Sequence, residues 1–173
     1  MSTESIKNAI RDVPDFPQKG IIFKDITPVL QNAELLRETV HLLCRSYKAE
    51  NIHAVAGIES RGFIFGGAMA LYLGCAFIPI RKPGKLPYST YQEKYELEYG
   101  SDALEIHRDA VGKGQNILLV DDLLATGGTA QAAAKLIEKC GGHVAGIQFF
   151  IELTILKGIE RLKGYRVDSL IRF

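Results

Sequence analysis

Two adjacent carboxylates, Asp121 and Asp122, stand shortly before a pair of glycines in the sequence Val-Asp-Asp-Leu-Leu-Ala-Thr-Gly-Gly-Thr of residues 120–129. Ionised aspartates accept hydrogen bonds from sugar hydroxyls or bind a hydrated Mg²⁺. Gly127 and Gly128 permit positive φ and close backbone approach, so successive N–H groups can converge on an anion. A carboxylate pair beside an anion site predicts a ribose phosphate as the ligand.

The rest of this loop supports an anion site. Thr126 and Thr129 supply hydroxyl donors, Thr129 can also cap the following helix, and that helix adds free N–H groups and the positive end of its dipole. A glycine loop between a strand and a helix is often only a connection, and an aspartate at a strand end often only caps a helix. Acids, threonines and glycines together favour binding. The segment matches neither G-x-G-x-x-G nor Walker A.

A second loop repeats this logic in Gly-Ile-Glu-Ser-Arg-Gly, residues 57–62. Ser60 can cap the next helix, and Arg61 brings a forked cation to the helix start, where it suits a second phosphate group. The alternative is a capped helix with a solvated arginine.

A long basic segment, residues 81–94, carries Arg81, Lys82 and Lys85 among tyrosines, prolines and a glycine. A solvated charged loop is the ordinary interpretation of such a segment. Beside two phosphate loops, a basic lid that closes on pyrophosphate is the better one.

Apolar periodicity predicts strands that alternate with helices, which is typical of a parallel sheet wound on both faces. The acidic pair is expected at the carboxyl end of its strand, because aspartates without partners cannot continue into a buried core. The fold class is therefore α/β, a doubly wound, mostly parallel sheet flanked by helices. The expected helices cover 33–50, 61–73 and 131–140; the expected strands cover 53–58, 75–80, 95–99, 103–107, 117–120 and 144–152.

The sequence predicts a single domain, residues 1–173, that includes two distinct segments, a flap and a lid. Residues 1–32 contain three prolines with aromatic residues, which predicts an ordered but irregular flap that covers the sheet edge without joining it and can form a pocket for a flat ring. Residues 81–100 form the flexible lid, which ends in a β-hairpin around residues 100–102.

Composition excludes several classes of protein. The 173 residues are 47% hydrophobic and 24% charged, and the formal net charge of +1 argues against nucleic-acid binding. The sequence has no membrane-spanning apolar run and no signal peptide, so we expect no membrane partner. Cys44, Cys75 and Cys140 lie in apolar patterns and indicate reduced thiols in a cytoplasmic protein. The four histidines lack metal-ligand spacing.

Several segments over nearly the whole chain resemble the purine and pyrimidine phosphoribosyltransferases, most closely the members that use adenine. They are Gly-Ile-Ile-Phe-Lys-Asp-Ile-Thr-Pro, Gly-Ile-Glu-Ser-Arg-Gly-Phe, Arg-Lys-Pro-Gly-Lys-Leu-Pro, Leu-Glu-Tyr-Gly and the acidic–glycine segment. The resemblance implies a type I fold of that family and a transfer of phosphoribose from phosphoribosyl pyrophosphate to adenine, giving AMP and pyrophosphate. It also implies Mg²⁺ as cofactor and a homodimer.

The resemblance assigns a role to each motif. Mg²⁺ is held mainly by the substrate, near the acidic pair, and the peptide before Ser60 is often cis in this family. Adenine lies against Phe23, with backbone groups of Ile22 to Lys24 at its exocyclic amine, and Glu98 exchanges a proton with the ring. The phosphoribosyl-binding residues are Asp121, Asp122, Ala125, Thr126, Gly127, Gly128 and Thr129. The pyrophosphate-binding residues are Ser60, Arg61, Arg81 and Lys85.

Adenine is expected because enzymes for 6-oxopurines usually carry a third carboxylate where this chain has Ala125. The alternatives are an enzyme for another purine such as xanthine, and a non-catalytic regulator that senses phosphoribosyl pyrophosphate. The chain has no room for an added DNA-binding domain, and an intact lid with Glu98 argues for turnover. A generic NAD-binding domain is less favoured because its fingerprint is missing.

Overall fold

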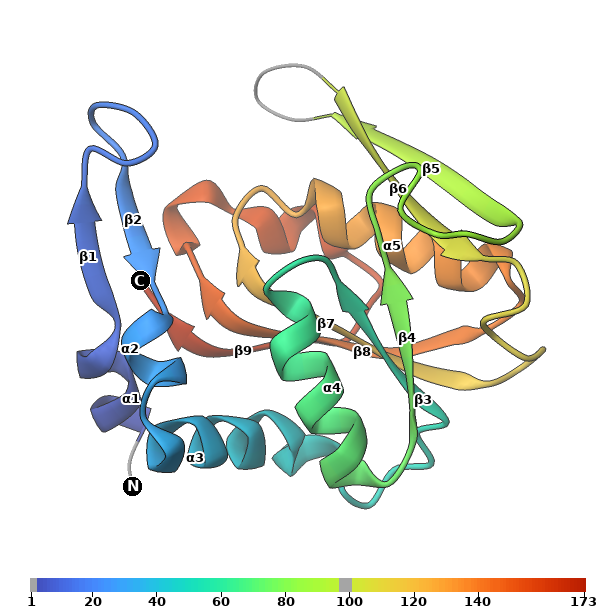
Figure 1. The fold of residues 1–173 in the computed structure, drawn as a ribbon, viewed down its shortest axis with the longest axis horizontal. Coiled ribbons are helices and arrows are strands. Elements are labelled where there is room, and N and C mark those ends of the chain that lie inside the picture. Colours follow the sequence, from blue (N-terminus) through green and yellow to red (C-terminus); the bar gives the residue numbers. More distant parts are fainter. Residues whose placement is uncertain (1–2, 97–100) are drawn as a thin grey trace.

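The computed structural model describes residues 3–96 and 101–173 and is built around a five-stranded parallel sheet with the order β4-β3-β7-β8-β9 (Figure 1). The chain places β4 on one side of β3 and the later strands on the other side, so the winding reverses between β3 and β7. Open α/β sheets bind ligands at such a reversal, beyond the carboxyl ends of the strands. The strands are β3 (Ala54–Ile58), β4 (Ala76–Ile80), β7 (Asn116–Leu124), β8 (His143–Glu152) and β9 (Val167–Arg172).

Helices cover both faces of this sheet, as the alternation predicted (Figure 1). Val55 and Leu118 pack into the core under α3 and α4, whereas Ala56 and Leu119 pack into the core under α5. The helices are α1 (Thr3–Ala9), α2 (Thr27–Leu30), α3 (Ala33–Cys44), α4 (Gly62–Leu73) and α5 (Gly128–Lys139). Short 3₁₀ turns are η1 (Arg45–Tyr47), η2 (Thr154–Leu156) and η3 (Gly158–Leu162). No helix in the described ranges is long and apolar enough to cross a membrane.

Two predicted helix bounds were wrong. The helix expected over 33–50 ends at Cys44, because the chain turns through η1 to bury Tyr47 completely. The Tyr47 hydroxyl fills the space beside Gly146, where a side-chain Cβ would lie 2.4 Å from it, and donates to Asp168 Oδ2 at 3.2 Å. The helix expected from residue 131 already begins at Gly128.

The acidic pair lies near the carboxyl end of β7, as predicted, but the strand includes both aspartates and continues to Leu124, so its predicted end at residue 120 was wrong. The ladder with β8 pairs Asp121 with Phe149 and continues to Leu124. The strand tolerates these carboxylates because Asp122 has a cationic partner in Arg61.

The amino-terminal segment is more regular than predicted. Strands β1 (Arg11–Pro14) and β2 (Ile22–Asp25) form a separate antiparallel hairpin, and it does stay outside the central sheet (Figure 1). The turn between the strands contains Gly20 at φ +90° and a cis Phe16–Pro17 bond, and the other proline of the hairpin, Pro14, ends β1.

The lid hairpin was predicted, but its strands are longer than expected. They are β5 (Thr90–Glu96) and β6 (Ser101–His107), and Glu96 pairs with Ser101. β5 begins earlier than predicted because Tyr91 and Tyr95 both pack against the α5 side of the core. They are four residues apart and therefore lie on the same face of the strand. The hairpin lies above α5 (Figure 1).

Candidate active site

The acidic pair on β7 lies at the winding reversal of the sheet, where Asp122 is buried and Asp121 is half-buried. Asp122 Oδ2 lies 2.7 Å from Arg61 Nη2, and the Asp122 N–H donates to Asp121 Oδ1 at 2.9 Å. Burial raises the pKa of both carboxyls; the charge of Asp122 raises the pKa of Asp121 further, and Arg61 opposes the rise in the pKa of Asp122. The carboxylates therefore favour a ligand that offers them hydroxyl donors or positive charge.

Gly62, the first residue of α4, allows the second loop to approach the acids. A Cβ at this position would lie 2.9 Å from Asp121 Oδ1 and 3.1 Å from the Val120 carbonyl oxygen. Only glycine lets the positive end of the α4 dipole come this near to the carboxylate.

The phosphate loop connects β7 to α5 and surrounds a cavity of about 160 Å³. Gly127 precedes the helix at φ +80°, in the left-handed region that the two glycines predicted. Thr129 lies inside α5, and the helix begins without a side-chain cap in the described structure. Helix α4 also begins without one, at Arg61 and not at Ser60. The predicted capping roles of Thr129 and Ser60 were therefore wrong. The cavity is lined by Asp121, Leu123, Leu124, Ala125, Thr126, Gly127, Thr129, Ala130 and Phe149.

Arg61 connects the acids to the amino-terminal hairpin. Its guanidinium carbon lies 5.0 Å from the centre of the Phe23 ring, and Phe16 meets the same ring edge-on at 5.2 Å between centroids. One arginine therefore touches both an aromatic ring and a buried carboxylate. The β2 hairpin strand thus lies where a planar group on Phe23 would be close to a sugar on Asp122.

The neighbours of Phe23 on β2 have different surroundings. Lys24 Nζ lies 2.6 Å from Asp12 Oδ1 and 3.9 Å from the centre of the Phe173 ring, so this side chain is tied to β1 and the carboxyl terminus. Ile22 is exposed and lines a cavity of about 500 Å³ between the hairpin and residues 153–156.

The loops after β3 and β4 are joined by an ion pair. Arg81 Nε lies 2.6 Å from Glu59 Oε2, and Arg81 Nη1 donates to the Lys85 carbonyl oxygen at 3.1 Å. The Glu59–Ser60 peptide is cis, as the family resemblance implied. Arg81 is thereby held beside Ser60, while Lys85 is exposed.

The comparisons with known proteins agree with this geometry. Residues 25–170 match the phosphoribosyl transferase domain. The chain belongs to the phosphoribosyltransferase family. It is 53% identical over 173 residues to the adenine phosphoribosyltransferase of Thermoanaerobacter sp. (strain X514), covering 100% of both chains. It is 54% identical over 168 residues to that of Christiangramia forsetii, covering 97% of this chain and 98% of the other.

Solved phosphoribosyltransferases share the fold. The adenine phosphoribosyltransferase of Thermoanaerobacter pseudethanolicus superposes with a TM-score of 0.97 at 52% identity, covering 99% of this chain and 100% of the other. The Saccharomyces cerevisiae enzyme, solved with adenine and an iminoaltritol bisphosphate, superposes with a TM-score of 0.92 at 39% identity, covering 97% of both chains. The predicted fold class and family are confirmed.

The structure brings together most of the residues singled out in the sequence. Arg61 contacts both Asp122 and Phe23, and Arg81 pairs with Glu59, which lies two residues before Arg61 in the chain. Glu98 lies outside the described residues, so its assigned role stays a prediction.

Sequence reasoning missed the partners of one cation in the basic segment, Lys82. Lys82 donates to Asp102 Oδ2 and, at 2.8 Å, to the Tyr95 hydroxyl, which ties the basic segment to both strands of the lid hairpin. Lys82 lay in the basic segment that the sequence did single out, but its carboxylate partner carried no separate signal.

The acidic pair would hold a Mg²⁺ ion only if a bound substrate supplied further oxygen ligands. Carboxylate oxygens suit this ion, which usually keeps several waters and substrate phosphate oxygens. Within residues 3–96 and 101–173, no group of three or more histidine, cysteine, aspartate or glutamate side chains could hold a metal. Asp121 and Asp122 would therefore hold Mg²⁺ together with oxygens of the substrate.

Proposed function

We propose that the protein transfers the 5-phosphoribosyl group from phosphoribosyl pyrophosphate to adenine, giving AMP and pyrophosphate in purine salvage. The observation that carries this proposal is the position of Arg61, which contacts both Phe23 and Asp122. A single side chain thereby links an aromatic surface for a base to carboxylates for a ribose, next to the cation Arg81. The adenine phosphoribosyltransferases similar to this chain support the choice of base.

The adenine site is proposed on β2. The described chain pairs one edge of β2 with β1, which leaves backbone groups of Ile22 to Lys24 on the other edge for the exocyclic amine and ring nitrogens. The ring of Phe23 supplies a flat apolar surface. The alternation of the strand places the Lys24 side chain toward Phe173, so Lys24 contributes through its backbone.

The ribose phosphate is proposed to bind along β7 and the loop that follows. The N–H groups and hydroxyls from Ala125 to Thr129, at the start of α5, hold the 5′-phosphate. Asp121 and Asp122 accept hydrogen bonds from the ribose hydroxyls. Fixing both ends of the sugar orients C1′ toward the base on Phe23.

Departure of pyrophosphate is assigned to the cations of the two neighbouring loops. As the C1′–oxygen bond loosens, negative charge grows on the leaving group, and Arg61, Arg81 and Lys85 stabilise it; Arg61 and Arg81 are held in place by Asp122 and Glu59. Mg²⁺, when bound through substrate oxygens, supplies further positive charge there. The lid of residues 81–100 excludes water, and Glu98 exchanges the proton of the adenine ring.

A comparison of bases tests this function directly. With phosphoribosyl pyrophosphate and Mg²⁺, adenine is expected to give AMP, whereas hypoxanthine, guanine and xanthine give negligible nucleotide, because Ala125 supplies no third carboxylate to the loop. Nucleotide formation from each base alone is followed by chromatography. Efficient use of a 6-oxopurine contradicts the choice of base. Tight binding of phosphoribosyl pyrophosphate without any nucleotide favours a sensor instead.

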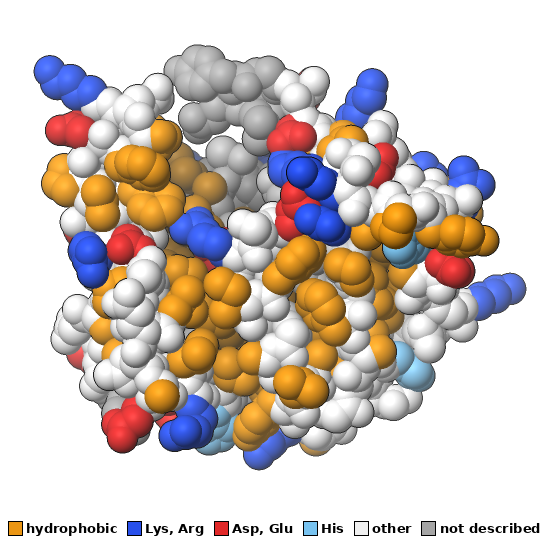
Figure 2. Space-filling view, viewed as in Figure 1, with side chains coloured by type: hydrophobic (Ala, Val, Ile, Leu, Met, Phe, Trp, Pro, Cys, Tyr) orange, Lys and Arg blue, Asp and Glu red, His pale blue; other side chains and the backbone are white. Residues whose placement is uncertain are grey.

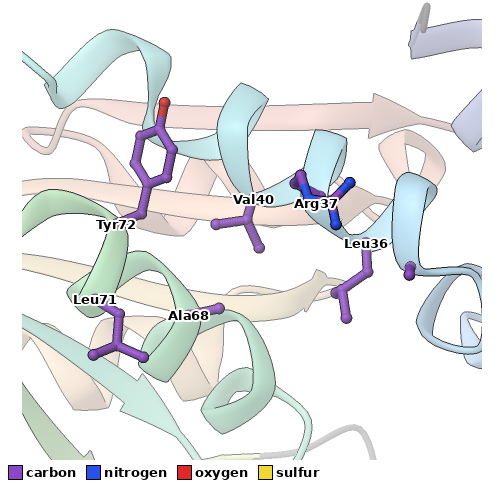
Figure 3. A pocket seen from close by; sticks show the side chains of 7 residues that line it. Leu36, Arg37, Val40, Ala68, Leu71 and Tyr72 are labelled. Atoms are coloured by element: carbon purple, nitrogen blue, oxygen red, sulfur yellow. The ribbon is translucent and has the colours of Figure 1, made fainter.

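We also propose that the protein is a cytoplasmic homodimer. The dimer is supported by helix α4, whose solvent face carries Leu71, 87% exposed, and Tyr72, 41% exposed. Hydrophobic side chains gather over α4 (Figure 2), and Leu71 and Tyr72 of α4 line a groove of about 480 Å³ together with Leu36 and Val40 of α3 (Figure 3). An apolar face of this kind fits a second copy of the chain. The cytoplasmic location is supported by three free thiols.

Leu71→Glu is expected to convert the dimer to monomer, because it places a charge at the centre of the buried apolar contact. Light scattering after size-exclusion chromatography measures the mass. Ile155→Glu is the matched control, since Ile155 is 86% exposed on a different surface, and it should remain a dimer. A monomeric parent protein, or a dimeric Leu71→Glu variant, contradicts this interface.

A further inference from the structure

The phosphate loop is backed by a segment to which the sequence assigned no role. After β8 the chain makes the turns η2 and η3, and Gly158, the first residue of η3, touches the loop. A Cβ on Gly158 would lie 2.1 Å from the Ala125 carbonyl oxygen and 2.9 Å from its carbon. A Cβ on Gly127 would lie 2.4 Å from the Gly158 carbonyl oxygen. The two glycine backbones therefore interlock.

This segment is itself fixed to the core. The Leu153 N–H donates to the Leu124 carbonyl oxygen at 2.9 Å, and Gln131 Nε2 of α5 donates to the Arg161 carbonyl oxygen at 3.0 Å. Leu162 is buried on the α5 side of the sheet. Because the segment is held at both ends, it can resist displacement of the loop.

Gly158 contacts the Ala125 carbonyl oxygen, and the orientation of this oxygen sets the direction of the Thr126 N–H. In a trans peptide the carbonyl oxygen and the following N–H point in opposite directions in one plane. The Ala125 oxygen meets Gly158, so the position of Gly158 fixes the direction of the Thr126 N–H. That N–H belongs to the set assigned to the 5′-phosphate.

We infer that Gly158 is a positioning residue for the 5′-phosphate of the substrate. The inference rests on the proposed function, because it takes residues 125–129 as the phosphate site. Gly158 acts without touching the ligand: its missing side chain allows the loop to adopt the shape in which the Thr126 N–H points at the anion. A methyl group at this position must push the Ala125–Thr126 peptide away, because the nearest atom it would meet, the Ala125 carbonyl oxygen at 2.1 Å, is backbone; it would also meet the Leu124 side chain at 2.9 Å.

Gly158→Ala in the full chain tests the inference by calorimetric titration with ribose 5-phosphate and, separately, with pyrophosphate. Ribose 5-phosphate binding is expected to weaken about tenfold to a hundredfold, because a displacement of about 1 Å costs up to this much. Pyrophosphate binding should change by less than about twofold, since its cations lie on other loops. In steady-state assays KM for phosphoribosyl pyrophosphate should rise while KM for adenine stays unchanged.

Gly67→Ala is the matched control, because a Cβ there has no heavy atom within 4 Å among the described residues. It should leave both titrations unchanged. A folded Gly158→Ala protein with normal ribose 5-phosphate binding overturns the inference, and so does equal weakening for both ligands, which indicates general damage to the fold.

If Gly158→Ala does not fold, Gln131→Met provides the test. It removes the amide that holds η3 to α5 and retains a good helix former. Ribose 5-phosphate binding should weaken by about twofold to fivefold with pyrophosphate binding unchanged, and no weakening overturns the inference. These titrations need no turnover, so a parent protein that binds ribose 5-phosphate but makes no AMP contradicts the proposed reaction and leaves the role of Gly158 standing.

Discussion

Asp122→Asn is expected to lower kcat/KM for phosphoribosyl pyrophosphate by about a hundredfold or more. The amide keeps the shape of the side chain but loses its charge, so the ribose hydroxyls lose a strong acceptor and Arg61 loses the partner that holds it at 2.7 Å. A hundredfold loss in kcat/KM corresponds to about 2.7 kcal/mol of transition-state stabilisation, which is in the range of a lost hydrogen bond to a charged group. Steady-state kinetics with saturating adenine measure the effect.

The same substitution should shift the pH profile in a defined direction. The pKa of Asp121 is raised first by burial and then by the charge of Asp122. Because the ionised acid binds the ribose, the acid limb of the rate profile lies above the ordinary range of an aspartate. Removing the charge of Asp122 lowers the pKa of Asp121, so the acid limb moves to lower pH.

Stability should follow the same linkage. A carboxyl whose pKa is higher in the folded chain than in the unfolded chain destabilises the fold as it ionises, so stability falls as pH rises from about 3.8 through the raised pKa. In Asp122→Asn this fall should be smaller, as measured by urea unfolding over that range. Asp168→Asn is the control, since Asp168 also pairs with an arginine, at 3.4 Å from Arg166 Nε. No shift of the acid limb of the rate profile is expected in Asp168→Asn. An acid limb that also stays in place in Asp122→Asn contradicts the assignment of this limb to Asp121.

The position of the site could be predicted because its signals are local. Polar and glycine residues follow directly after apolar strands, and in a parallel sheet all such strand ends meet at one edge. Residues 57–62 and 120–129 therefore had to come together once the strands were recognised. The positive φ of Gly127, +80°, could also be predicted from a local signal, since the residue type alone indicates that conformation.

The features that escaped prediction depend on partners distant in sequence. The aspartates continue β7 because Arg61, from another loop, neutralises Asp122. Lys82 meets Asp102 across the lid hairpin, and neither residue indicates the other. Gly158 acts through backbone contact, which produces no side-chain pattern at all. Local periodicity predicts elements and their edges, whereas these contacts are set by tertiary packing.

Arg61→Ala is expected to reduce kcat/KM by about a hundredfold to a thousandfold, and it should affect both substrates. The guanidinium holds Asp122, contacts the Phe23 ring and faces the leaving pyrophosphate, so its loss removes charge and leaves a buried carboxylate without a counter-ion. KM for adenine should rise more here than in Asp122→Asn, because Asp122→Asn weakens the hold on Arg61 but keeps the guanidinium that contacts Phe23. Arg61→Lys should recover only part of the activity, because lysine keeps the charge but not the planar fork.

The pH profile of Arg61→Ala should move opposite to that of Asp122→Asn. The positive charge of Arg61 lowers the pKa of both acids against the effect of burial, so removing it raises both pKa values and moves the acid limb of the rate profile to higher pH. Arg166→Ala is the control, because Arg166 also pairs with an acid and stacks on a ring, 4.5 Å from the centre of Tyr47, outside the site. An acid limb that stays in place or moves down in Arg61→Ala would show that Asp121 and Asp122 do not govern the ionisation required for catalysis.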